Sequence, residues 1–175
     1  MSQRLIALTD IVGYSSPIRN HVDRTRMRNQ LDLLMRTLFG SDHDSWYEGR
    51  GDGMLVVLPE TITQMDWLPL AFETTGKSLL DSYNGRAAVS ARMSLRVALD
   101  RGEVDTDLMG YNGNCMIRAG RLIDSKLFKR AMAASRATIG LITPTELTRR
   151  FSLGGHSNVR TQVKGMPISA SMRFM

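Results

Sequence analysis

Residues 5–16 read LIALTDIVGYSS, and residues 51–58 read GDGMLVVL. Each stretch joins an apolar run of strand length to an aspartate near glycine, Asp10 in the first and Asp52 in the second. A buried strand holds its terminal carboxylate rigidly, and the adjacent glycine lets phosphate and Mg²⁺ approach the backbone. Two such carboxylates on adjacent strands suit two cations about 4 Å apart. The alternative is that both aspartates are only turn residues, which are common at strand ends.

The apolar periodicity alternates between strands and helices along the chain. Residues 27–38 carry an apolar stripe of helical spacing that ends at Gly40, and residues 62–83 and 115–134 indicate two further helices. Residues 93–99 alternate as a strand with one buried face, residues 137–142 form a short apolar strand, and residues 168–174 alternate as the last strand. Strands with helical crossovers and a terminal hairpin predict an α/β (α+β) sandwich of the ferredoxin-like kind.

Length and composition indicate one compact domain over residues 1–175, with 42% hydrophobic and 23% charged residues. No apolar stretch approaches the roughly 18 residues of a membrane span, and no signal peptide precedes the first strand. We therefore expect a cytoplasmic protein without a membrane partner. Cys115 is the single cysteine, so no internal disulfide is expected, and the three scattered histidines suggest no zinc cluster.

Basic residues outnumber acidic ones by 23 to 17, which gives a net charge of +6. Such an excess suits either a nucleic-acid surface or a pocket for a highly charged anion. The basic residues are spread along the chain, and no stacked aromatic residues accompany them as a single-strand binder requires. The pattern therefore favours solvated helix faces and a triphosphate ligand over nucleic acid.

Five blocks of the sequence resemble, in the same order, the class III nucleotidyl cyclases, the family of adenylate and guanylate cyclase catalytic domains. The blocks are LTDIVGYSS (8–16), GRGDGMLVVLP (49–59), SLRVALDRGEV (94–104), GYNGNCMIRAGRL (110–122) and QVKG (162–165). The resemblance spans nearly the whole chain. It implies the ferredoxin-like sandwich of that catalytic domain, with a mostly antiparallel central sheet flanked by helices.

The resemblance also implies the parts of a catalytic site. Asp10 and Asp52, with the carbonyl of Ile11, would hold two Mg²⁺ or Mn²⁺ ions. The phosphates of a nucleoside triphosphate would lie on backbone N–H groups of Val12, Gly13, Tyr14 and Ser15.

Two cations are implied on the other side of the substrate. Arg121 matches the arginine that stabilises the transition state in the family, and Lys164 matches the lysine that reaches the triphosphate. Each also has a plain alternative, a surface helix arginine and a hairpin-turn lysine. In the family the arginine comes from a second subunit, so the resemblance implies a head-to-tail homodimer with an inactive monomer.

One position departs from the family pattern. The asparagine expected four residues before Arg121 is Ile117, which cannot hydrogen-bond a ribose oxygen. Arg118 is adjacent and could substitute in part, or the position could belong to the core. This change favours a turnover-deficient module that binds nucleotide or dimerises as one alternative to an enzyme, and a structural or nucleic-acid-binding protein is a third.

The positions that recognise the base also depart from the family pattern. Glu48 occupies the position that reads guanine in the family, but the second reading position falls on Gly110, which has no side chain. Tyr47 and Arg50 crowd the same hairpin, and Arg50 with Glu48 could satisfy the carbonyl oxygens and N3–H of uracil. The chain in this respect is similar to the short bacterial Pycsar antiviral cyclases. We therefore expect UTP as substrate and a cyclic-nucleotide signal in antiphage defence read by a downstream effector, with a guanylate cyclase as the alternative.

Overall fold

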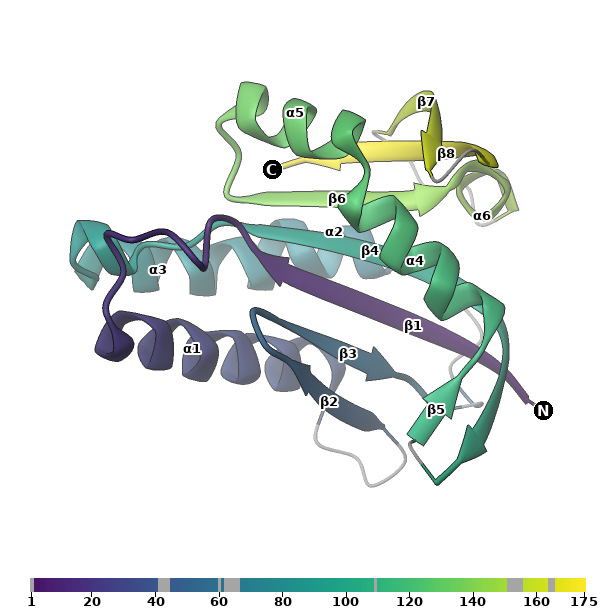
Figure 1. The fold of residues 1–175 in the computed structure, drawn as a ribbon, viewed down its shortest axis with the longest axis horizontal. Coiled ribbons are helices and arrows are strands. Elements are labelled where there is room, and N and C mark those ends of the chain that lie inside the picture. The colour runs from purple at the N-terminus through teal and green to yellow at the C-terminus, as the bar shows by residue number, and fades with distance from the viewer. Residues whose placement is uncertain are drawn as a thin grey trace.

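The protein is described by a computed structural model over residues 2–40, 45–59, 61, 67–108, 110–150, 156–163 and 166–175. A mixed sheet runs through its centre in the order β2-β3-β1-β4-β6-β8-β7, and β5 pairs with β4 beside this path (Figure 1). Neighbouring strands are antiparallel except β4 and β6, which the α4 and α5 crossover joins in parallel. The strands are β1 (Ser2–Ile11), β2 (Trp46–Arg50), β3 (Gly53–Val57), β4 (Leu95–Asp107), β5 (Gly110–Asn112), β6 (Ile139–Pro144), β7 (Ser157–Val163) and β8 (Met166–Phe174).

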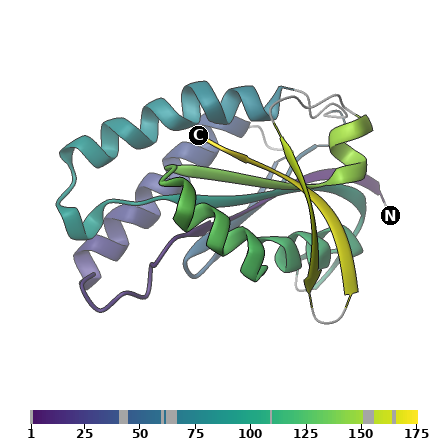
Figure 2. The ribbon, with the colours of Figure 1, turned by 90° about the horizontal axis from the view of Figure 1, so that it is seen from above.

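Helices cover both faces of this sheet. Figure 2 shows α1 and the α2–α3 segment on one face, and α4 with α5 on the other. A π-helical turn, Phe72–Gly76, joins α2 to α3. The helices are α1 (His21–Phe39), α2 (Leu68–Ala71), α3 (Lys77–Arg86), α4 (Asn114–Asp124), α5 (Lys126–Ser135) and α6 (Thr145–Arg150). The expected mixed α/β architecture with a mostly antiparallel sheet is therefore confirmed.

Helix α1 forms as its sequence predicts. The side chain of Asn20 accepts from the Asp23 backbone N–H at 2.9 Å, and the Asp23 carboxylate accepts from the Asn20 N–H at 3.3 Å. This reciprocal capping box satisfies two amides that the first turn leaves without helical partners. The predicted apolar stripe is buried against the sheet, and the helix ends at Gly40, whose φ of 78° suits glycine.

Two apolar cores flank β4. Val97 and Leu99 face α1 and the α2–α3 segment, whereas Ala98 faces α4 and α5. The strand expected over 93–99 is present, but β4 runs from Leu95 to Asp107. The expectation of one buried face was wrong, because α4 covers the second face.

The helix expected over residues 115–134 is two helices. Ser125 leaves the helical conformation, with ψ 135°, and its hydroxyl accepts from the Phe128 N–H at 3.3 Å as the N-cap of α5. The apolar period continues across this break, so periodicity alone did not indicate it. The helix expected over 62–83 begins at Leu68 in the described part and continues to Arg86. Within the described residues, no helix is long and apolar enough to span a membrane.

Candidate active site

Asp10 lies near the end of β1, opposite Gly53 on β3 and Arg96 on β4. The Arg96 Nε donates to the Asp10 carboxylate at 2.8 Å, and a second guanidinium nitrogen contacts the same oxygen. Burial raises the pKa of the Asp10 carboxyl, the Arg96 guanidinium opposes this rise, and the neighbouring Asp52 carboxylate adds to it. The two carboxylates predicted to act together therefore do lie together.

Close backbone packing brings Asp52 to this point. The Ile11 N–H donates to the Asp52 carbonyl at 2.9 Å, and the Thr9 hydroxyl bonds the Met54 backbone. A Cβ at Gly53 would lie only 1.9 Å from the Thr9 carbonyl oxygen. Glycine at residue 53 is therefore required for the hairpin that carries Asp52 to approach β1 this closely.

The donors at this point suit a hard divalent cation. The Asp52 carboxylate is near enough to add to the rise of the Asp10 pKa, and such repulsion between two carboxylates is what a bound cation relieves. Groups of three or more His, Cys, Asp or Glu side chains that could enclose a metal are absent from the described residues. Mg²⁺ is usually bound by one or two carboxylates, and substrate phosphates and water complete its coordination shell. Asp10, Asp52 and the Ile11 carbonyl fit such an ion.

The β1–α1 loop turns at Gly13, whose φ is 64°. The N–H groups of Val12 and Tyr14 already donate to the carbonyls of Ser94 and Ile11, at 2.9 and 3.3 Å. The expectation that all four amides from Val12 to Ser15 face phosphate was therefore too broad. Gly13 and Ser15 are left as the predicted amide donors.

A basic cavity of about 360 Å³ opens beside this loop. Arg96 and Gly13 line it together with Lys129 and Arg136, which come from α5 and the turn after it. These three cations were not predicted as site residues. The sequence indicates them only through its excess of basic residues. Arg96 reaches the cavity from β4, and the other two come from the end of the crossover between β4 and β6, more than 100 positions from Gly13.

The base-reading candidates separate into two groups on β2. Glu48 pairs with Arg50 at 3.0 Å, and a Cβ at Gly110 would lie 3.9 Å from the Glu48 carboxylate. Tyr47 faces the other side, where its hydroxyl donates to the Gly40 carbonyl and Arg36 covers its ring at 4.6 Å. Because successive strand residues point to opposite faces, the structure brings Glu48, Arg50 and Gly110 together but not Tyr47.

Arg121 lies in a different cavity, of about 630 Å³, between α4 and the residues 101–103 of β4. Along β1, Arg4 stands opposite Gly102 whereas Asp10 stands opposite Arg96. The cavity begins at the Gly102 level, but α4 runs back along β1, since a Cβ at Gly120 would lie 4.0 Å from the Leu8 side chain. The residues that line the Arg121 cavity include neither Asp10 nor Asp52. Lys164 falls outside the described residues.

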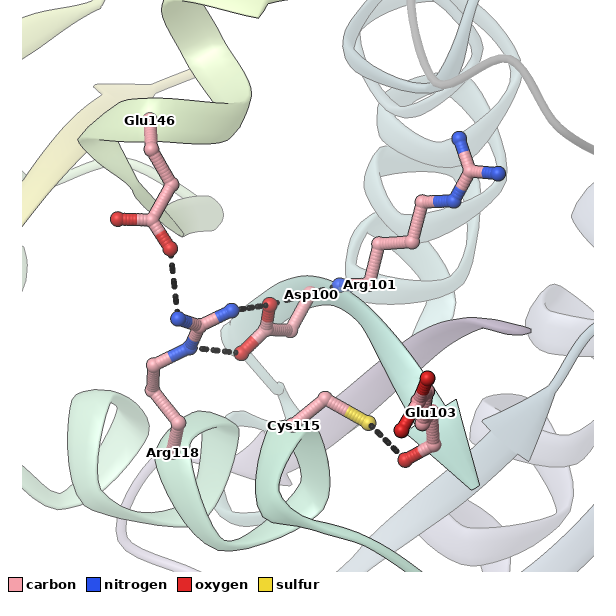
Figure 3. Close-up of polar contacts among 6 residues, drawn as sticks. All are labelled: Asp100, Arg101, Glu103, Cys115, Arg118 and Glu146. Carbon is pink, nitrogen blue, oxygen red and sulfur yellow. Dashed lines mark hydrogen bonds and ion pairs between the residues drawn. The ribbon is translucent and has the colours of Figure 1, made fainter. Parts of the chain in front are cut away.

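Arg118, beside the position of the missing asparagine, makes its side-chain bonds to the protein itself. Its guanidinium binds Asp100 and Glu146 (Figure 3). The Ile117 residue is 55% exposed, so it is not a core residue of this chain. The expectation that this position belongs to the core is therefore wrong, whereas partial substitution by Arg118 stays a prediction.

The same architecture occurs in solved cyclase structures. The adenylyl cyclase CyaB from P. aeruginosa has a TM-score of 0.62 at 15% identity, over 97% of this chain and 92% of that chain. The adenylate/guanylate cyclase/hydrolase from Silicibacter pomeroyi has a TM-score of 0.64 at 15% identity, over 100% and 99%. The guanylate cyclase domain of RhGC from Catenaria anguillulae, solved with GTP, has a TM-score of 0.60 at 14% identity, over 98% and 95%.

These likenesses establish the fold, which is that of the class III adenylyl and guanylyl cyclase catalytic domains. No protein-family model matches the chain, and no curated protein matches it.

Proposed function

We propose that this chain is a nucleotidyl cyclase, which converts a nucleoside triphosphate into a 3′,5′-cyclic monophosphate and pyrophosphate. The observation that supports this best is the meeting of Asp10 and Asp52 at the ends of β1 and β3, beside a cavity lined by cations. It occurs on a fold shared with adenylyl and guanylyl cyclases.

The 3′-hydroxyl gives its proton to solvent as its oxygen bonds to the α-phosphorus, and the bond between the α-phosphorus and the oxygen that bridges to the β-phosphorus breaks. Negative charge grows on the phosphate oxygens and on the departing pyrophosphate. The cavity that Arg96, Lys129 and Arg136 line supports binding of that pyrophosphate portion, and Gly13 would let it approach the backbone. Arg96 and Lys129 also pair with Asp10 and Asp124. Two Mg²⁺ or Mn²⁺ ions held by Asp10, Asp52 and the Ile11 carbonyl would supply Lewis acidity to the phosphate oxygens.

Arg121 and Lys164 complete the proposal as cations that stabilise the transition state. Arg121 lines a cavity that includes neither carboxylate, which supports a head-to-tail homodimer, in which each site takes its carboxylates from one protomer and Arg121 from its partner. Two equivalent sites would then form across the interface.

The substrate within this proposal is UTP. Glu48 and Arg50 form an acceptor and a donor fork on one face of β2, with Gly110 beside them. Uracil presents carbonyl acceptors and an N3–H donor, which match that pair. The cyclic UMP would serve as a second messenger in antiphage defence. A guanylate cyclase is the alternative that Glu48 by itself favours.

Incubation of the purified protein with Mn²⁺ and each of the four ribonucleoside triphosphates, followed by mass spectrometry, tests the activity. We expect cyclic UMP and pyrophosphate, and we expect Asp52→Asn to keep the fold and lose Mn²⁺-dependent turnover. The exposed-pair variant Asp81→Asn is the matched control and should retain activity. Nucleotide binding without any product would instead support the turnover-deficient module, and near wild-type turnover by Asp52→Asn would place the site elsewhere.

A further inference from the structure

Asp100 is a buried carboxylate that the proposed reaction does not use. It lies on β4, its exposed fraction is 0%, and it shares the sheet face that α4 covers. Burial raises the pKa of the Asp100 carboxyl, and its bonds to Arg118 oppose that rise. Buried ion pairs are often no more stabilising than apolar residues of similar volume. The presence of this pair therefore points to a role in geometry.

The pair has the geometry of a fork. Arg118 donates from Nε and from one terminal nitrogen to the two Asp100 oxygens, at 2.7 and 2.6 Å. Its other terminal nitrogen donates to Glu146 at 2.6 Å, and the Arg101 backbone N–H donates to Asp100 at 2.7 Å (Figure 3). One guanidinium thus joins β4, α4 and α6, and a bidentate bond permits little rotation of the group that makes it.

This fork lies next to the residue proposed to stabilise the transition state. Arg121 follows Arg118 by one helical turn, and both line the same cavity. Apolar packing also holds α4 against β4, and a Cβ at Gly102 would lie 2.9 Å from the Cys115 Cβ. Apolar contacts of this kind bring a helix close but are not directional. The Asp100 fork adds a charged, bidentate and therefore directional contact, alongside the weaker bond from the Cys115 thiol to the Glu103 carbonyl.

We propose that Asp100 is a positioning residue, which holds Arg118 in a bidentate pair and so sets the rotation of α4 that aims Arg121 at the substrate. The proposal rests on the proposed function for the role of Arg121. Arg118 acts through the helix, because its donors are directed to Asp100 and Glu146.

Cys115 provides a reporter of α4 docking that does not depend on activity. It is the only cysteine in the chain, its exposed fraction is 3%, and its thiol lies 3.9 Å from the Glu103 carbonyl beneath α4. The rate at which a thiol reagent such as DTNB modifies Cys115 in the native protein measures how often α4 leaves β4.

The experiment compares Arg118→Met, the double variant Asp100→Val/Arg118→Met and the control Asp81→Asn, by thiol labelling and by kcat and KM. In Arg118→Met the Asp100 charge is buried without its partner, so we expect labelling about tenfold faster. We expect kcat about 100-fold lower, with KM changed less than about threefold. In the double variant an apolar pair restores packing, so labelling returns to the wild-type rate while kcat stays low. Asp81→Asn should behave as wild type.

Three results would overturn the proposal: unchanged labelling in Arg118→Met, recovery of kcat together with thiol protection in the double variant, or a rise in KM with kcat unchanged. The second would mean that the pair only stabilises docking, and the third that Arg118 binds substrate directly. If Arg118→Met does not fold, Arg118→Lys takes its place, because lysine keeps the charge but cannot form the bidentate pair. Its labelling rate, kcat and KM are then compared with those of the wild type in the same way. A wild-type protein that cyclises none of the triphosphates would contradict the proposed function, whereas the labelling rates would still decide whether the pair holds α4.

Discussion

Gly53 is the residue on which the approach of the two carboxylates depends. A side chain there would meet the Thr9 carbonyl oxygen, whereas a Cβ at Gly85, near the end of α3, would meet nothing within 4 Å. We expect Gly53→Ala to lower the free energy of unfolding by about 3 kcal/mol or more, because backbone must move. Gly85→Ala should raise it by roughly 0.5–1 kcal/mol, because alanine favours helix. Thermal unfolding of the two variants checks both signs, and equal destabilisation would contradict this account.

Burial raises the pKa of Asp10, and Arg96 opposes that rise. The pKa of Asp10 is higher in the folded than in the unfolded protein, so the protonated carboxyl favours folding. Its contribution to the free energy of unfolding is therefore full below the unfolded pKa and is lost as the pH rises through the folded pKa. Catalysis needs the carboxylate, so activity is full above the folded pKa and is lost as the pH falls through it. Arg96→Met removes the cation that lowers this pKa, and the acid limb of kcat/KM should move to higher pH.

The control for that shift is Arg92→Met, which removes an exposed arginine near the same end of the sheet. Its pH profile should match the wild type in shape and position. An acid limb that stays in place in Arg96→Met would show that Asp10 does not set it.

At the scale of elements, the β2–β3 hairpin is expected to read the base. Strand alternation places Glu48 and Arg50 on one face and Tyr47 on the other, so only the first two can contact one ligand together. In a mixture of the four triphosphates at equal concentration, we expect UTP first, then GTP, CTP and lastly ATP. The preference for UTP should be large, because a mismatched base leaves buried polar groups unpaired.

The two faces of this hairpin supply matched variants. Arg50→Gln should reduce the preference for UTP at least about tenfold, because it removes the donor fork from the base. Tyr47→Phe should keep the preference and affect only the contact with Gly40. A dominant cyclic GMP product from the wild type would overturn the pyrimidine assignment and leave the cyclase proposal standing.

The whole molecule divides its proposed site into two halves. The carboxylates lie beside the basic cavity, whereas Arg121 lines a different cavity between α4 and β4. An Asp10→Asn chain and an Arg121→Ala chain should each be inactive as homodimers. Their mixture should recover activity, because one of the two sites in each heterodimer contains only wild-type residues. Activity would be measured after mass analysis has shown that heterodimers form, and none recovered there would contradict the head-to-tail arrangement.

The local sequence determined the parts of this protein whose partners are near in the chain or repeat at a fixed period. The α1 stripe and its end at Gly40 follow from helical spacing, and the carboxylates at Asp10 and Asp52 follow from apolar runs that end near glycine. The mostly antiparallel sheet followed from the order of five short blocks that resemble a known family.

Tertiary structure alone decided the contacts between residues far apart in sequence. Arg96 meets Asp10 across 86 positions, and Arg118 binds Asp100 and Glu146. No periodicity encodes which side chain a strand or helix will face once it docks, because that choice depends on packing and on the burial of charge. The same reason explains why the cations beside Gly13 became known only from the folded chain, whereas the opposite faces of Tyr47 and Glu48 follow from strand alternation.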